Sequence, residues 1–65
     1  MEHQQVSLNR LPKVIDRVGL QKSAIYAKIA KGEFPAPIRI SAGAVAWPSS
    51  AIDQWISDRM AEARK

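Results

Sequence analysis

The sequence predicts a small, mainly α-helical domain that carries one β-hairpin. Apolar residues recur at helical spacing in three stretches, and between the second and the third stretch apolar residues alternate on both sides of a glycine. A chain of 65 residues can form one domain, and a domain of this size buries only about 60% of the surface that its unfolded form exposes. We therefore expect a single core of marginal stability.

The composition excludes several classes of protein. With no cysteine, neither disulfides nor a thiolate metal site can supplement the core. The single histidine, His3, has no second ligand near it, and no catalytic constellation or phosphate-binding glycine loop occurs. We expect no enzyme activity, no cofactor, no metal and no small-molecule ligand. No apolar run approaches the roughly 20 residues that span a bilayer, and the first residues are too polar for a secretory signal, so we expect a cytoplasmic protein without membrane contact.

The first helix is expected to begin at Pro12, because proline suits the first helical position, and to end before Gly19. Three apolar residues share one face of it: Val14, Ile15 and Val18. Ahead of this helix, Val6 and Leu8 can add a short extended piece to the core.

The second helix is expected between Gly19 and Gly32, with Gln21 at the N-cap. Ile25 and Ile29 are spaced i and i+4 and share the packing face. Gly32 suits the left-handed residue that closes a helix, and the proline that follows shortly after cannot continue one. Only Gly19 to Gln21 separate the two helices, and a short connection that contains a glycine is typical of a helix-turn-helix.

A hairpin follows the second helix. Phe34 is expected in the core, and the prolines after it keep the connector extended. Residues 38–40 and 45–47 alternate, with a turn from Ser41 to Ala44 centred on Gly43. We expect three residues of the hairpin to face the core: Ile40, Val45 and Trp47. Arg39 then points outward.

The last helix is expected to begin at Ser49 or Ser50, and Ser50 together with Asp53 matches a capping box. Its apolar face is formed by Ile52, Trp55, Ile56 and Met60. We expect Trp55 to fill the core and the residues beyond Met60 to fray.

Positive charge is concentrated in one part of the chain. Between Arg10 and Arg39 there are seven basic residues and two acidic ones, a local balance of +5, while the rest of the chain carries −1. This distribution is typical of a nucleic-acid-binding face, although lysine and arginine can also do no more than solvate a surface.

The run from residue 8 to about 58 resembles the AlpA family of small phage-derived regulators, which are relatives of the excisionase and MerR-type winged helix-turn-helix proteins. The motifs that carry the resemblance are LPxV, GLxxSxIY, KGEFPxP and the later AW and QWI. The resemblance implies a DNA-binding transcriptional regulator, often linked to prophage or integrative-element genes. It also implies that the second helix enters the major groove and that the hairpin serves as the wing.

The sequence therefore predicts a winged helix-turn-helix of three helices and a two-stranded wing over residues 8–60, with a flexible tail over 1–7 and a frayed end over 61–65. The candidates for contact with base edges are Lys22, Ser23, Ala27 and Lys31. The candidates for contact with the DNA backbone are Arg10, Lys13, Arg17, Tyr26, Lys28, Arg39, Ser41 and Gly43. The ring of Tyr26 is expected to pack beside Ile25 while its hydroxyl reaches a phosphate.

Duplex DNA is the expected partner, and self-association on DNA or contact with an integrase or RNA polymerase stays open. One alternative is an excisionase-like factor that bends an attachment site for an integrase. A more distant alternative is a protein-interaction module whose basic face meets an acidic partner.

Overall fold

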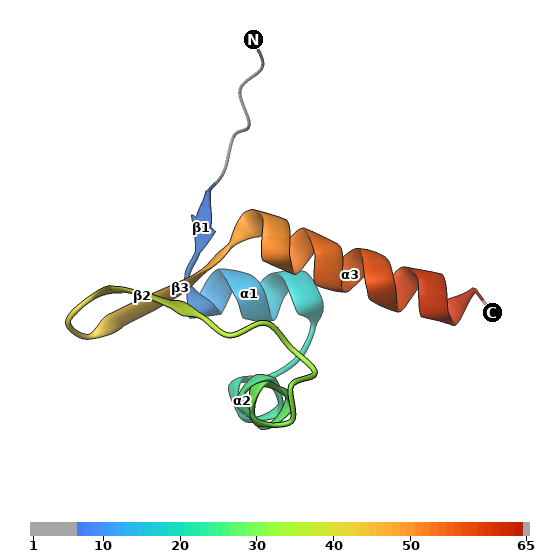
Figure 1. Cartoon of the computed structure of the whole chain (residues 1–65), viewed down its shortest axis with the longest axis horizontal. Helices are drawn as coiled ribbons and strands as arrows, with labels where there is room; N and C mark the ends of the chain where they lie inside the picture. Colours follow the sequence, from blue (N-terminus) through green and yellow to red (C-terminus); the bar gives the residue numbers. More distant parts are fainter. Residues whose placement is uncertain (1–6, 65) are drawn as a thin grey trace, which may run out of the picture.

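The computed structural model describes residues 7–64, which form three helices and a three-stranded antiparallel sheet (Figure 1). In chain order the elements are β1 (Leu8–Asn9), α1 (Leu11–Val18), α2 (Lys22–Ala30), β2 (Ile38–Ser41), β3 (Ala44–Pro48) and α3 (Ser49–Ala63). The predicted class, mainly helical with one hairpin wing, is confirmed. Residues 1–6 of the expected tail lie outside the described residues, and the domain boundaries stay a prediction.

The helix-turn-helix is present. α1 begins at Leu11, so Pro12 is in its first turn, and it ends at Gly19, whose φ of 74° is left-handed and whose N–H donates to the Ile15 carbonyl at 2.9 Å. α2 begins at Lys22, directly after an extended Gln21. In Figure 1, α1 lies across the view and α2 is seen end-on below it, so the two helices cross. The connection between the two helices is therefore Gly19 to Gln21, as the sequence predicts.

A glycine also closes α2. Gly32 has a φ of 75°, its N–H donates to the Ile29 carbonyl at 3.0 Å, and the N–H of Glu33 donates to the Lys28 carbonyl at 2.8 Å. This pair of bonds is the Schellman motif, which satisfies the last carbonyls of the helix. The predicted end of the helix is confirmed, and it turns the chain toward the connector before β2.

The core draws one or more residues from each of the three helices, from β3 and from the connector: Val14, Ile25, Phe34, Trp47 and Ile52. Trp47 on β3 is fully buried, and its indole N–H donates to the Pro35 carbonyl at 2.8 Å. Trp55 is only half-buried; its ring centroid lies 5.1 Å from that of Phe34, and its indole N–H donates to the Glu33 carbonyl at 3.0 Å. The expectation that Trp55 fills the core is wrong: Trp55 packs against the edge of the core, and Trp47, which was also expected to face the core, is fully buried in it.

β1 adds a third strand at the base of the wing. The strand order is β1-β3-β2, and Leu8 and Asn9 pair with the end of β3. The N–H of Ser49 donates to the Ser7 carbonyl at 2.7 Å, and the N–H of Ser7 donates to the Ser49 Oγ at 3.3 Å. The part of the expected extended piece at Leu8 is therefore present, whereas Val6 lies outside the described residues, and the strand is bonded to the start of α3 through Ser7 and Ser49.

The wing differs from the expectation in which side chains it buries. Arg39 pairs with Val45, and directly paired residues of an antiparallel ladder lie on the same face of the sheet. Val45 packs against the core, so Arg39 is on the core-facing side of the sheet at this pair. An irregularity in register follows between Arg39 and Ser41, and Ile40 is 42% exposed. The expectation that Ile40 faces the core is wrong. The hairpin projects away from the helices, so nothing covers β2 (Figure 1).

The start and the end of α3 also differ from the expectation. Pro48 is the N-cap, no side chain caps the helix, and Ser50 lies inside its first turn, so the capping box is not formed. The Asp53 carboxylate bonds to Arg17 instead. α3 continues past Met60 to Ala63, and Met60 is 58% exposed rather than packed in the core. Among the described residues, no helix is both long and apolar enough to cross a membrane.

Candidate nucleic-acid interface

The outward face of α2 is small and uncharged. Ile25 anchors the helix and is fully buried, and Ile29 packs beside it at the next turn. On the opposite side, Ser23, Ala27 and Ala30 are all exposed at i, i+4 and i+7. Ser23 and Ala27 were predicted from the sequence, whereas Ala30 was missed, although its spacing from Ser23 is the signal that finds it. This surface allows a close approach of the helix backbone to whatever it meets.

Basic residues stand at both ends of this face. Lys22 is the first residue of α2, Lys31 is its C-cap, both are exposed, and α2 contains no acidic residue. Tyr26 lies beside the small face and is 39% exposed. Its ring is edge-on to Trp47, with 6.4 Å between centroids, so the ring packs on the core while part of the side chain stays at the surface.

The N-termini of α1 and α2 carry no side-chain cap. The N-caps are Arg10 and Gln21, neither makes a capping hydrogen bond, and the first turns contain no acid. Lys13 is exposed in the first turn of α1. Each helix therefore leaves backbone N–H groups free, with positive potential from the helix dipole, and this arrangement favours an anion.

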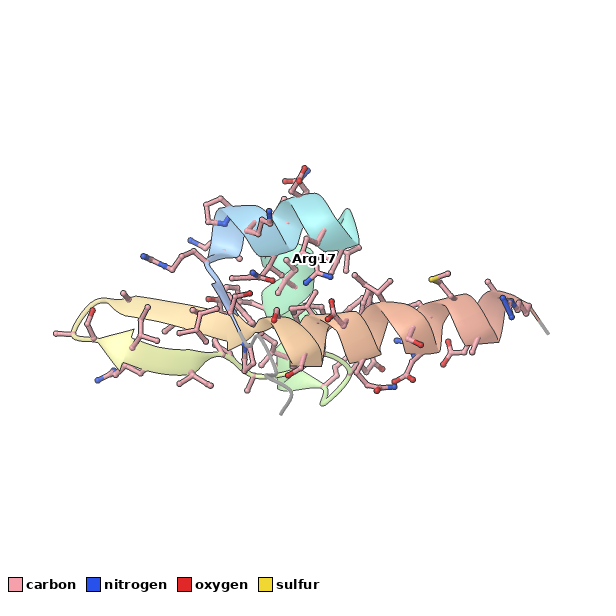
Figure 2. All side chains as sticks on the ribbon, turned by 90° about the horizontal axis from the view of Figure 1, so that it is seen from above. Arg17 is labelled. Carbon is pink, nitrogen blue, oxygen red and sulfur yellow. The ribbon has the colours of Figure 1, made fainter. Side chains whose placement is uncertain are left out.

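Arg17 lies between α1 and α3 (Figure 2) and is held by two side chains. Its Nη1 donates to the Asn9 Oδ1 at 3.0 Å, its Nη2 is bonded to the Asp53 carboxylate, and the side chain is 25% exposed. The Lys28 Nζ lies 3.9 Å from the Glu33 carboxylate. Of the predicted backbone contacts, these two cations already have partners within the fold.

The wing presents a small turn. Arg39, Ser41 and Gly43 are exposed, and the N–H of Gly43 donates to the Ser41 carbonyl at 2.9 Å. Gly43 has a φ of 153°, which side chains rarely adopt. Within residues 7–64, no group of histidines or carboxylates is arranged to hold a metal ion.

Comparison with known proteins identifies the family. The family of the prophage CP4-57 regulatory protein AlpA matches residues 7–60, a range that runs from the start of the sheet into α3. This chain belongs to the AlpA family. A similar protein is the uncharacterized ORF88 of Enterobacteria phage P4, which is 40% identical over 52 residues. The matched region covers 80% of this chain and 59% of that protein, so the chain spans a little over half the length of this relative. The AlpA-family resemblance drawn from the sequence motifs is confirmed, and the family is a regulatory one.

Proposed function

We propose that this AlpA-family protein is a transcriptional regulator that binds duplex DNA in a sequence-specific manner, with α2 in the major groove. The observation that carries the proposal is the outward face of α2, the second helix of the helix-turn-helix. Ser23, Ala27 and Ala30 on this face are small and exposed. An α-helix with its side chains is about 10–12 Å across and the major groove is about 12 Å wide, so a face of small residues lets the helix enter deeply.

Base-edge contacts are assigned to the residues at and around this face. Ser23 has a hydroxyl that donates and accepts, and the alanine methyl groups suit the methyl of thymine. Lys22 and Lys31, at the two ends of the helix, can donate to guanine or to the flanking phosphates. The helix has no acidic residue that would repel the DNA.

Backbone contacts are assigned to the exposed groups around α2. Arg10 and Lys13 stand at the uncapped start of α1, and Arg39 stands on β2. The wing turn supplies Ser41 and Gly43, and the Tyr26 hydroxyl reaches a phosphate at the edge of the helix. Arg17 and Lys28 each have an acidic partner within the fold, so a phosphate contact from either would exchange that partner for the DNA.

The first test is the salt dependence of binding to duplex DNA. Each phosphate contact releases counterions, so the affinity should fall by about 0.9 log units per log unit of salt for each contact. Footprinting across the neighbouring genomic region then locates the preferred site. An affinity that stays the same from low to moderate salt would contradict the proposal.

An architectural role is the second candidate, and one observation favours it. Ile38 and Ile40 are 47% and 42% exposed on the wing. Apolar side chains that enter the minor groove unstack base steps and bend the duplex. A bend at the preferred site that disappears on Ile40→Ser, measured by the gel mobility of circularly permuted fragments, would favour this role over promoter regulation alone.

A further inference from the structure

The C-terminal half of α3 extends beyond the helix that packs against it. α3 has 15 residues and α1 has eight, so at 1.5 Å per residue α3 is about 22 Å long and α1 about 12 Å. In both figures the C-terminal turns of α3 project past the end of α1. The inward stripe of α3 loses cover in the same direction, because Ile52 is buried, Ile56 is half-buried and Met60 is 58% exposed.

A shallow cavity of about 320 Å³ runs along this part of α3, and Arg17 closes one side of it. The other residues that line the cavity come from α3 and its C-cap: Asp53, Ile56, Ser57, Met60, Ala61 and Arg64. Four of these residues, at positions 53, 57, 60 and 64, are spaced by four, three and four residues, which is the spacing of a two-helix seam. We call this surface the α3 seam.

The α3 seam is complementary to itself. When a second α3 is laid antiparallel, with the two-fold axis between Asp58 and Arg59, Asp53 faces the partner's Arg64. In the same register Ser57 faces the partner's Met60, whereas Ile56 and Ala61 lie on opposite flanks of the seam and do not face each other across it. The four residues along the centre of the seam thus pair with one another across the two-fold axis: an acid meets a base, and the large Met60 meets the small Ser57. Large residues opposite small ones are what close helix packing requires.

The charged ends of the seam are free to make this contact. Arg17 binds one oxygen of the Asp53 carboxylate, Oδ1, yet the Asp53 side chain remains 64% exposed. Its other oxygen has no hydrogen bond among the described residues and can accept from the partner's Arg64. Rim ion pairs of this kind set register and orientation more than affinity.

From this complementarity we propose that the α3 seam is the contact surface for a second copy of this chain, in an antiparallel two-fold dimer. The contact is isologous, so each copy supplies the same residues. The contact involves only a few turns of one helix from each copy. We therefore expect the surface it buries to be well below the roughly 1,200–2,000 Å² of a stable interface, and the dimer to be weak in isolation. The proposal does not depend on DNA binding.

The test measures the mass of the whole chain by sedimentation equilibrium without DNA, from about 10 µM to about 1 mM, a range in which weak complexes populate. The average mass of the wild type should rise from monomer toward dimer. Met60→Glu places a charge in the seam of each copy and should weaken association at least about tenfold. Gln54→Glu adds the same charge to the same helix away from the seam, and it should associate like the wild type.

A size exchange distinguishes a second copy from any other partner surface. Ser57→Met alone places methionine against methionine, and Met60→Ser alone places serine against serine, so each single variant should associate more weakly. The double variant Ser57→Met with Met60→Ser restores one large and one small residue in every facing pair, and its association should return to within about threefold of the wild type. All variants change exposed residues, and their unfolding temperatures check that they fold.

Three results would overturn the proposal: a wild-type chain that stays monomeric at the highest concentration, association that Met60→Glu leaves unchanged, or a double variant no stronger than either single variant.

Discussion

Arg17 of α1 and Asp53 of α3 form an ion pair that joins two helices far apart in the sequence, and the same guanidinium donates to Asn9 of β1. Asn9 is only 9% exposed, so the loss of Arg17 would leave its side-chain oxygen without this donor in a nearly buried position. The position of Arg17 therefore indicates a role in joining α1, β1 and α3.

Arg17→Met should lower the free energy of unfolding by about 1–3 kcal/mol, the cost of an unsatisfied buried polar group, with little added by the exposed end of the ion pair. Urea denaturation measures this loss. Lys13→Met is the matched control. Because Lys13 is exposed, the free energy of unfolding of this variant should stay within about 0.5 kcal/mol of the wild type. If Arg17→Met kept full stability and instead lowered the salt slope of DNA binding by about one unit, Arg17 would be a phosphate contact.

The two tryptophans should differ in their contribution to stability. Trp47 is fully buried at the centre of the core, and Trp47→Ala should cost about 3–5 kcal/mol, enough to unfold a domain of this size. Trp55 is half-buried at the edge, beside Phe34 and below the Arg59 guanidinium, which lies 5.1 Å from its ring centroid. Trp55→Ala should leave a cooperative unfolding transition at a lower temperature. Circular dichroism melts of both variants decide this, and a Trp47→Ala protein that melts above Trp55→Ala would contradict the assignment.

Gly32 should be sensitive to any L side chain. Its φ is 75°, and a Cβ added there meets nothing within 4 Å, so the cost comes from the backbone alone. Gly32→Ala should lower the free energy of unfolding by about 1–2 kcal/mol. Gly32→Asn should cost less, because asparagine tolerates the left-handed conformation, and a synthetic chain with D-alanine should lose nothing. Equal costs for L- and D-alanine would show that the left-handed conformation is not what Gly32 provides.

Much of the fold was predictable because local residues fix where each helix ends. Gly19 and Gly32 have the left-handed φ that the sequence predicts, and each donates its N–H to the end of the helix before it. The three-residue connection between α1 and α2, Gly19 to Gln21, establishes the helix-turn-helix without any long-range information. The hairpin was likewise predictable from the alternation on both sides of Gly43.

The errors concern long-range packing. Met60 and Ile40 have the right spacing to face the core, but α1 is shorter than α3 and no helix covers β2, so both side chains remain exposed. The spacing of apolar residues predicts which face of a helix or strand is apolar. It does not predict whether a neighbouring element is long enough to cover that face. The partners of Arg17 could not be predicted either, because Asn9 and Asp53 are brought to it only by the folded chain.

The candidate site shows the same division. The exposure of Ser23 and Ala27 follows from their position opposite Ile25 on a helix, and the structure agrees. Only the fold shows that the Lys28 Nζ lies 3.9 Å from the carboxylate of Glu33 in the connector, whereas Lys13 has no ion pair among the described residues.

We propose that α2 reads the DNA sequence while the surrounding cations bind any DNA. The most direct measurement is a pair of titrations for each variant, one with the footprinted site and one with a scrambled duplex of the same length, at several salt concentrations. A bulky residue in place of Ser23, Ala27 or Ala30 should weaken binding to the preferred site by about 1–3 kcal/mol per lost base contact, with little change on scrambled DNA.

Lys13→Ala and Arg39→Ala are the matched opposites in these titrations. Each should weaken binding to both DNAs alike and lower the salt slope by about one unit. Equal losses on both DNAs for every variant, those on the small face of α2 included, would contradict the claim that α2 reads sequence.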